Sequence, residues 1–208
     1  KKLRSRSVTI SNIYPTDLPV HKLRGLTVNR VESRQQSDIY NSVMDQHHYL
    51  GYTPMAGAQL RYLILWEKGL LGAIGFGASA WKIAPRDLYI GWKPSLREKN
   101  LHLIVNNSRF LILPDVHSAN LASKVLSMCA RRIPDDFVTQ YGYRPVLLET
   151  FVERGRFRGH CYKAANWQCV GQTKGRGKKH KYKTPKIAVK DIWLYPLCRD
   201  FRRILLSQ

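Results

Sequence analysis

Apolar segments recur along the whole chain, and their periodicity alternates between that of a strand and that of a helix. The segments QLRYLILWE (59–67) and LLGAIGFGASAW (70–81) are strand-like, and Lys68-Gly69 between them is typical of a hairpin turn. Between residues 119 and 133, apolar positions recur at i, i+4 and i+8, which is typical of a helix. The sequence shows no internal repeat and no heptad pattern. A chain with this alternation is expected to fold around a sheet flanked by helices.

The same periodicity gives the order of elements, which is strand, helix, hairpin, strand, helix, strand, short helix, strand. The expected strands are one within 8–33 and those at 59–67, 70–81, 109–114, 144–152, 167–173 and 190–197. The expected helices are 34–50, with Ser37 as its N-cap, a short one near 95–100 in an otherwise looped segment, 119–133, 159–167 and 200–207. This order predicts an α+β fold with a mixed central sheet of about six or seven strands. We expect one domain over residues 1–208, with an N-terminal extension (1–33) and a basic C-terminal loop or clasp (171–208).

The charge of the chain restricts its partners. Lys and Arg number 35 against 14 Asp and Glu, which gives a net charge of +21 and a pI near 10.2. Fifteen of these basic residues, but only two acidic ones, lie between Arg154 and the C-terminus. With 44 % hydrophobic residues the chain can build a core, so a disordered polybasic chain is excluded. A one-sided basic surface on a folded domain predicts binding of DNA or RNA.

The sequence gives no sign of a membrane segment. The longest apolar runs, such as residues 70–80, are broken by glycine and fall short of the roughly 18 residues that span a bilayer. The first residues lack the apolar core of a signal peptide and an initiator Met, so the chain can be an internal fragment of a cytoplasmic protein. The four cysteines form no CxxC pair, which favours free thiols over a zinc site.

The half of the chain from Arg109 onward resembles the GCN5-related N-acetyltransferase fold. The segments RFLILP, NLASKVLSMCARR, PVLLETFV, HCYKAAN and WQCVGQT follow its order of strand, cofactor-binding helix, strand, tyrosine-bearing helix and strand. The resemblance implies CoA as cofactor and Tyr162 as general acid. Those enzymes hold the CoA pyrophosphate with a glycine-containing loop before the helix. Here that loop, PDVHSANLAS, has no glycine and carries Asp115, so CoA-dependent N-acyl transfer is an alternative rather than the first hypothesis.

Longer strings are similar to the DruA family, which is known from the Druantia anti-phage system and from relatives beside transposase genes. They are HHYLGY (47–52), GAQLRYLI (57–64), LGAIGFGASAWKIAPRDLYIGW (71–92), NLHLIVNNSRFLILP (100–114), RPVLLETFV (144–152), CYKAANWQCVGQTKGRGK (161–178) and KDIWLYPL (190–197). The resemblance covers nearly the whole chain from about residue 8. It implies action on DNA, in defence or in transposition, with defence-system or transposase proteins as partners.

Metal-dependent DNA cleavage needs carboxylates that converge on Mg²⁺ or Mn²⁺. Glu149 is the first candidate, as ligand or base, because it stands in the otherwise apolar segment PVLLETFV; its alternative is an ion pair with an arginine. Asp87 is the second candidate, and a turn-forming role is its alternative. Asp191 is the third, and its alternative is capping of a strand or helix.

Three further residues are candidates for proton transfer or nucleophilic attack. His47 and His48 form a pair of which only one can serve a single site, and we take His48 as the candidate base or ligand. His160 is expected near Glu149, with a solvent-exposed loop position as its alternative. Tyr162 could form a phosphotyrosine link or act as general acid, and otherwise it packs on the sheet.

The expected DNA contacts come from two kinds of segment. Asn107 and Arg109 stand before an apolar strand, where Asn106-Asn107 could instead form a turn, and Arg156 and Arg158 lie close to Tyr162. The glycine-containing loop after residue 171 supplies phosphate-binding charges and one aromatic ring for stacking on an unpaired base. Its candidates are Lys174, Arg176, Lys178, Lys179, Lys181 and Tyr182, and a merely solvated charged loop is their alternative.

The sequence therefore supports three functions. The first is a DNA-binding and DNA-processing protein with nuclease, nickase or transposase-like activity on DNA, single strands included. The second is a CoA-dependent N-acyltransferase. The third is a non-catalytic DNA-binding subunit that recruits partner enzymes.

Overall fold

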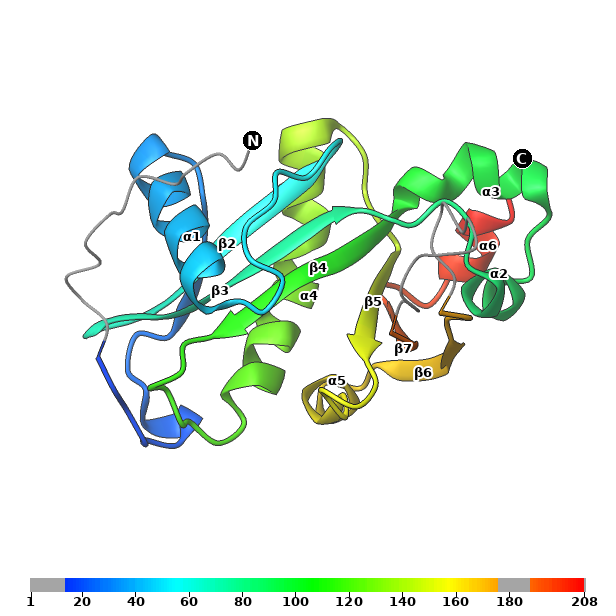
Figure 1. Ribbon diagram of the computed structural model, residues 1–208. Coiled ribbons are helices and arrows are strands. Elements are labelled where there is room, and N and C mark those ends of the chain that lie inside the picture. The colour runs from blue at the N-terminus through cyan, green and yellow to red at the C-terminus, as the bar shows by residue number, and fades with distance from the viewer. Residues whose placement is uncertain (1–13, 176–187, 208) are drawn as a thin grey trace. The chain divides into compact units, whose positions relative to one another are not determined.

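The structure is a computed structural model that describes residues 14–175 and 188–207. Its elements in chain order are η1 (Val20–Lys22), β1 (Thr27–Arg30), α1 (Arg34–His47), β2 (Gln59–Trp66), β3 (Gly69–Ala78), α2 (Ala84–Ile90), α3 (Pro94–Asn100), η2 (Leu101–Leu103), β4 (Ile104–Ile112), α4 (Leu121–Tyr141), β5 (Leu147–Glu153), α5 (His160–Ala164), β6 (Gln168–Gln172), β7 (Lys190–Pro196) and α6 (Phe201–Leu205). The strands form one mixed sheet in the order β1-β2-β3-β4-β5-β7-β6, labelled in Figure 1. The predicted α+β class with about seven strands is confirmed.

The chain divides into two compact units. Unit 1 consists of residues 1–77 and 107–132, and unit 2 consists of residues 78–106 and 133–208. No helix among the described residues is long and apolar enough to cross a membrane.

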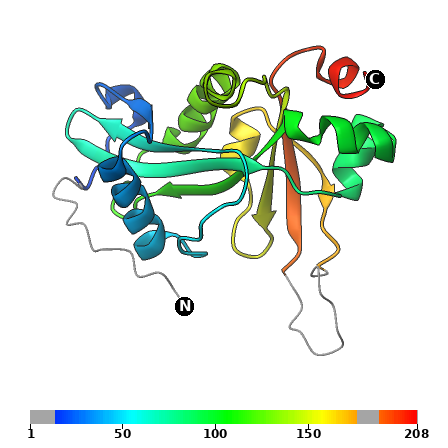
Figure 2. The same ribbon diagram turned by 90° about the horizontal axis from the view of Figure 1, so that it is seen from above.

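Unit 1 is built on the predicted hairpin. β2 and β3 pair antiparallel, β1 pairs with the outer edge of β2, and Figure 2 shows α1 and the first part of α4 on opposite faces of these strands.

The N-cap residue of α1 differs from the predicted one. Ser33, not Ser37, is the N-cap, because its hydroxyl accepts the Gln36 N–H while the Gln36 side chain accepts the Ser33 N–H.

Unit 2 is built on β5, β7 and β6, which pair antiparallel in that order. Its core on one face of β5 and β7 contains Leu147, Ile192 and Leu194, covered by residues of α2 and α6 such as Ile90 and Phe201. Because side chains alternate along a strand, the register places Glu149 on this face with Leu194. The opposite face carries Thr150 and Trp193.

The segment 85–101 departs from the expectation of a loop with one short helix. It forms α2 and α3, each with a proline in its first turn, Pro85 and Pro94. Proline at this position gives up no helical hydrogen bond, so the two prolines are compatible with the first turns of helices. Gly91 separates the helices with φ of 85°, a backbone angle that glycine adopts without strain.

Candidate nucleic-acid interface

A buried ion pair occupies the position where sequence analysis placed a metal ligand. Glu149 on β5 and Arg86 on α2 are both fully buried, and Arg86 Nη1 donates to Glu149 Oε2 at 2.9 Å. The second oxygen, Oε1, accepts the Ala80 N–H at 2.9 Å. Both carboxylate oxygens are therefore engaged, and the negative charge of Glu149 neutralises a guanidinium that no water reaches.

Asp87 belongs to the same cluster. Its Oδ1 accepts hydrogen bonds from the Arg86 Nε at 3.0 Å and from the Trp92 indole at 3.1 Å. Its Oδ2 lies 3.6 Å from Arg97 Nη1. Two carboxylates thus stand against two guanidiniums, and the cluster is electrically balanced within unit 2.

Burial raises the pKa of the Glu149 carboxyl, whereas the Arg86 guanidinium and the Ala80 N–H act to lower it. Among residues 14–175 and 188–207, no group of three or more His, Cys, Asp or Glu side chains could hold a metal ion. The oxygens of Glu149 and Asp87 are engaged by arginines, the Ala80 N–H and the Trp92 indole, so they do not fit the Mg²⁺ or Mn²⁺ site that the sequence suggested. Metal-dependent cleavage stays a prediction.

Asp191 does not join Glu149. In the antiparallel register Glu149 lies opposite Leu194, while Asp191 lies opposite Val152. Glu149 and Val152 are an odd number of residues apart, so Asp191 faces the other side of the sheet. Its carboxylate lies 3.5 Å from Arg154 Nε and is partly exposed.

Tyr162 also lies on the side away from Glu149. It is buried in α5, its ring centroid 6.4 Å from that of Trp193 and 5.2 Å from that of Trp167. Gly159 before it has φ of 69°, and a Cβ there would lie 2.7 Å from the Trp193 ring, so only glycine lets α5 pack this closely. His160 is exposed at the start of α5 rather than beside Glu149.

The predicted residues His48 and Asn107 lie in unit 1. His48 directly follows α1 as its C-cap, and its Nδ1 accepts the Leu50 N–H at 3.2 Å. Burial, followed by the charge of Arg109, lowers the pKa of His48 to about 4, so the ring is neutral at pH 7. Asn107 is buried, and its side-chain amide donates to the Gly75 and Arg109 carbonyls. These hydrogen bonds hold β4 to β3 and indicate a structural role.

Exposed arginines gather on the loop between β5 and α5. Arg154, Arg156 and Arg158 are all exposed, and Phe157 between them is 48 % exposed. The loop is anchored by backbone bonds from Arg154 N–H to Val189 O at 3.0 Å and from Phe157 N–H to Glu153 O at 3.0 Å. It therefore presents three guanidiniums and one aromatic ring from a fixed backbone.

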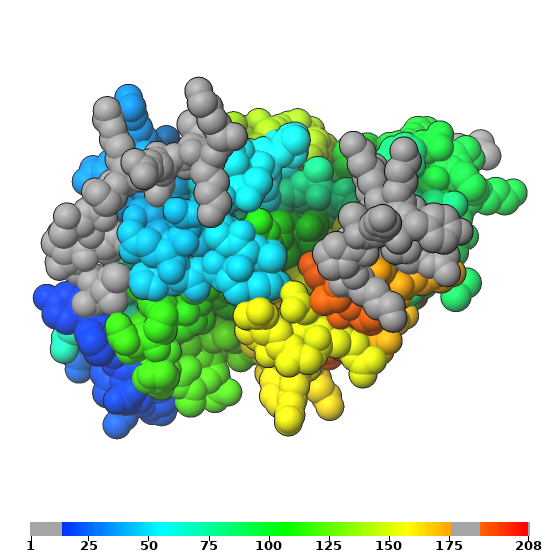
Figure 3. Space-filling view, in the orientation of Figure 1, coloured from blue at the N-terminus to red at the C-terminus, as the bar shows by residue number. Residues whose placement is uncertain are grey.

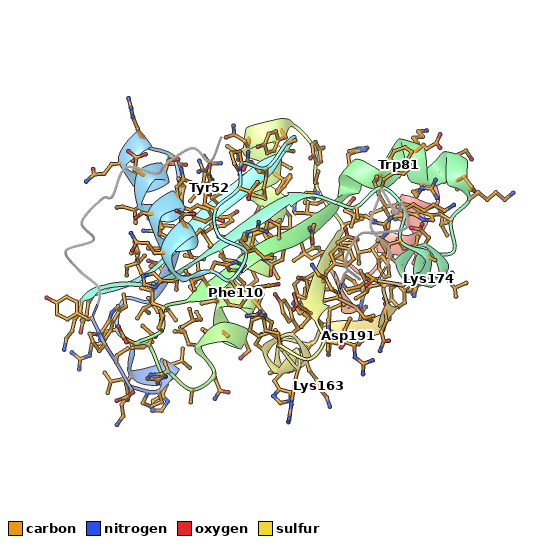
Figure 4. All side chains as sticks on the ribbon, in the orientation of Figure 1. Tyr52, Trp81, Phe110, Lys163, Lys174 and Asp191 are labelled. Carbon is orange, nitrogen blue, oxygen red and sulfur yellow. The ribbon has the colours of Figure 1, made fainter. Side chains whose placement is uncertain are left out.

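The strand register brings Lys174 to the same end of unit 2 as this loop. Glu153, which ends β5, pairs with Lys190, which begins β7, and Gln172, which ends β6, pairs with Asp191. The loop 154–159 and the connection that begins after β6 therefore leave the sheet at the same end of these three strands. Lys174 begins this connection and is exposed, and Figure 4 shows Asp191 near the loop and Lys174 beyond β6. Arg176, Lys178, Lys179, Lys181 and Tyr182 lie outside the described residues.

We call the set Arg154, Arg156, Phe157, Arg158 and Lys174 the basic edge. Figure 3 shows the residues around 155–165 and the start of β7 as neighbouring surfaces of unit 2. Arg156 lies 3.6 Å from Glu153 and Arg154 lies 3.5 Å from Asp191, but both arginine side chains remain more than half exposed, at 52 % and 55 %. Exposed pairs of this kind are weak, so the guanidiniums can exchange these carboxylates for phosphates.

Residues 4–185 match the model of the family described as Druantia protein DruA. The chain belongs to the DruA family. No curated protein matches the chain. The fold of this DruA protein is shared with acetyltransferases, among them spermidine/spermine N-acetyltransferase SpeG from Vibrio cholerae, at 11 % identity and a TM-score of 0.50 over 86 % of this chain and 96 % of that one.

Two other solved structures agree with this fold. A chimera of the Vibrio cholerae SpeG and hSSAT gives 11 % identity and a TM-score of 0.53 over 83 % of this chain and 95 % of that one. The polyamine N-acetyltransferase of Drosophila melanogaster gives 10 % identity and a TM-score of 0.50 over 82 % of this chain and 99 % of that one. The predicted acetyltransferase-like topology is confirmed, and identity this low shows the fold alone.

In this DruA chain, residues 16–20 form backbone hydrogen bonds with the loop before α4. Thr16 forms a parallel bridge with Val116, donates its N–H to Asp115 O at 3.1 Å and accepts the His117 N–H at 2.8 Å. Val20 N–H donates to Ala119 O at 3.3 Å. A pyrophosphate at a helix start needs free backbone N–H groups. Of these bonds only one engages an N–H group of the loop, that of His117, so CoA-dependent acyl transfer stays a prediction.

Sequence reasoning missed two features. It did not single out Phe157, although a large aromatic residue between two arginines in a glycine-flanked loop is a signal for base stacking. It also did not connect Tyr40 and Arg61 with Arg109. These three residues lie more than 20 positions apart on α1, β2 and β4, and no sequence spacing shows that they meet.

Proposed function

We propose that this DruA-family protein binds DNA through the basic edge of unit 2. Guanidiniums donate paired hydrogen bonds to phosphate oxygens, and three of them project from one anchored loop. Lys174 adds a fourth charge at the same end of these strands, and the sequence after it, outside the described residues, is rich in lysine. Family membership supports a setting in anti-phage defence or beside mobile elements, in the cytoplasm and with partner enzymes that process DNA.

The observation that carries this proposal is the β5-β7-β6 register. It brings Lys174 and the loop 154–159, which lie about 20 residues apart in the sequence, to the same end of neighbouring strands. Contacts to phosphates do not depend on sequence, so this edge would position DNA rather than read bases. Phe157 adds a ring that can stack only on an unpaired base, and this favours single-stranded or locally opened DNA.

The test is fluorescence anisotropy with a labelled single strand and a matched duplex over a range of salt concentrations. The variant Arg154→Gln/Arg156→Gln/Arg158→Gln removes three charges from the edge. A matched control, Arg24→Gln/Lys124→Gln/Arg131→Gln, removes three exposed charges from unit 1. For each lost phosphate contact, the slope of log K against log salt should flatten by about 0.7 to 0.9 in the edge variant only.

An edge variant whose affinity and salt slope match those of the control would contradict the proposal. Binding would then follow from the total charge of the chain rather than from this surface.

The buried ion pair of Glu149 and Arg86 affects how a test of DNA cleavage has to be designed. If Glu149 is a metal ligand or base, Glu149→Ala should abolish cleavage and spare DNA binding. Because Glu149 neutralises the buried Arg86, we expect the same variant to destabilise unit 2. A cleavage assay with Mg²⁺, Mn²⁺ or EDTA therefore needs a thermal unfolding curve of each variant beside it. Loss of cleavage in a variant that stays folded would restore Glu149 as a ligand or base.

A further inference from the structure

Unit 1 contains a small cavity lined by basic and aromatic side chains. Its walls come from α1, from the loop 51–57, from β2 and from β4, and they include Tyr40, Tyr52, Met55, Gln59, Arg61 and Arg109. The cavity measures about 10 Å³, which is room for roughly one water molecule or one oxygen atom of a larger group. Figure 4 shows Tyr52 on the side of β2 that α1 covers.

Tyr40 supplies a hydroxyl that has no hydrogen-bond partner among the described residues. The side chain is 2 % exposed, and its oxygen stands where a Cβ on Gly75 of β3 would collide with it. A buried hydroxyl without a partner costs free energy, about 1 to 3 kcal/mol, so such groups are rare unless a ligand or water meets them. Burial raises the pKa of Tyr40 further above its ordinary value, so the group remains a proton donor.

Arg61 and Arg109 bring two positive charges to the same place. Arg61 is half-buried over the Tyr40 ring, 5.4 Å from its centroid, and Arg109 lies close enough to influence the same hydroxyl. Their hydrogen bonds go to neutral groups: Arg61 to Ser37 and Asn41, and Arg109 to the carbonyls of Gly51 and Ser108. Among the described residues, no carboxylate forms an ion pair with either arginine.

Half-buried arginines without a counter-ion are unusual, because charges withdrawn from water are generally paired. The charge of Arg109 also acts on His48, where it adds to burial in lowering the pKa. A neutral water in the cavity would satisfy the Tyr40 hydroxyl but would leave both guanidiniums uncompensated. An anion satisfies all three groups.

We propose that this cavity binds one oxygen of a phosphate group, with the Tyr40 hydroxyl and the guanidiniums of Arg61 and Arg109 as donors. The rest of the group stays outside the cavity, where the two guanidiniums face its other oxygens. Phosphate fits better than carboxylate because three donors on three different elements match a tetrahedral anion, whereas a planar carboxylate presents two oxygens. The phosphate of a nucleotide or of DNA is the expected source. This site is separate in residues from the basic edge and stands whether or not that edge binds DNA.

The experiment uses the full chain with inorganic phosphate, a 5′-phosphorylated trinucleotide and the same trinucleotide with a 5′-hydroxyl, followed by calorimetry. Tyr40→Phe removes only the hydroxyl, and Arg61→Gln removes one charge. Arg131→Gln, an exposed arginine on α4, is the matched charge control. We expect Tyr40→Phe to weaken phosphate binding about 10- to 100-fold and Arg131→Gln to leave it unchanged.

The free protein provides an independent readout. Because the Tyr40 hydroxyl lacks a partner without ligand, Tyr40→Phe should leave the melting temperature unchanged or raise it. Tighter binding of the 5′-phosphorylated trinucleotide would identify a terminal phosphate, and equal binding an internal phosphodiester. The proposal is overturned if Tyr40→Phe and Arg61→Gln bind phosphate like the native chain, if acetate competes as well as phosphate, or if Tyr40→Phe lowers the melting temperature. None of these results depends on the basic edge.

Discussion

The buried arginine of unit 2 and the two half-buried arginines of unit 1 differ in the groups that accept their hydrogen bonds. Arg86 meets two carboxylates, Glu149 and Asp87, at 2.9 Å. Arg61 and Arg109 meet only neutral acceptors among the described residues. A charge that the protein itself compensates serves stability, and a charge left without compensation is available to a ligand. This difference separates a structural cluster from a candidate binding site, although sequence reasoning ranked Glu149 first for chemistry.

The largest expected effect is the loss of stability when the buried ion pair of Glu149 and Arg86 is broken. Glu149→Ala leaves the guanidinium of Arg86 buried with one carboxylate fewer, and should cost about 3 to 5 kcal/mol of unfolding free energy. In a chain of 208 residues each kcal/mol lowers the melting temperature by roughly 2 to 4 °C. The measurement is calorimetry of the native chain and the variant.

The control for this experiment is the double variant Arg86→Met/Glu149→Leu. Removing both charges together should recover much of the lost stability, because apolar side chains of similar size can replace a buried ion pair. A Glu149→Ala variant that is as stable as the native chain would show that the pair is not structural, and would return Glu149 to the list of catalytic candidates.

A smaller effect is expected at the exposed edge of unit 2. Phe157→Ala should weaken binding of a single strand by about 1 to 3 kcal/mol, since stacking on one base contributes this much, and should leave duplex binding unchanged. Anisotropy with both DNAs measures the difference. Trp81, another exposed aromatic residue of unit 2, provides the control variant Trp81→Ala. Equal losses on single strands and duplex would show that Phe157 shapes the loop rather than stacking on bases.

The smallest effect concerns His48 and the uncompensated charge of Arg109. The folded-state pKa of about 4 lies below the ordinary value of 6.5, so folding favours the neutral ring. This contribution is fully present above pH 6.5 and is lost as the pH falls from 6.5 towards 4. Urea unfolding of the native chain should therefore show a steeper loss over this range than His48→Asn does. His47→Asn, at an exposed neighbour, should behave like the native chain.

His48 also reports on the proposed phosphate site. A bound phosphate offsets the charge of Arg109, so its addition should raise the pKa of His48, as NMR titration of the ring would show. A pKa that does not move while phosphate binds would place the anion away from Arg109.

Local sequence signals determined the elements and the family. The Lys68-Gly69 hairpin, the helical spacing after residue 119 and the order of strands all reappear in the structure, because each depends on residues close together in the chain. α4 runs to Tyr141 rather than ending at 133, and the prolines of 85–101 begin helices, since packing overrides local preference at element ends. The net charge of +21 and the membership of the DruA family followed from the sequence alone.

Only the tertiary structure decided what each candidate side chain does. Whether Glu149 is a ligand or an ion-pair partner depended on α2, which lies 63 positions earlier in the sequence and brings Arg86 to it. Whether Asp191 could join it depended on a strand register, where a shift of one residue reverses the face. The meeting of Tyr40, Arg61 and Arg109 depended on the pairing of distant elements. Burial and long-range pairing set the charge state and the partners of a side chain, and neither is encoded in the spacing of residues along the chain.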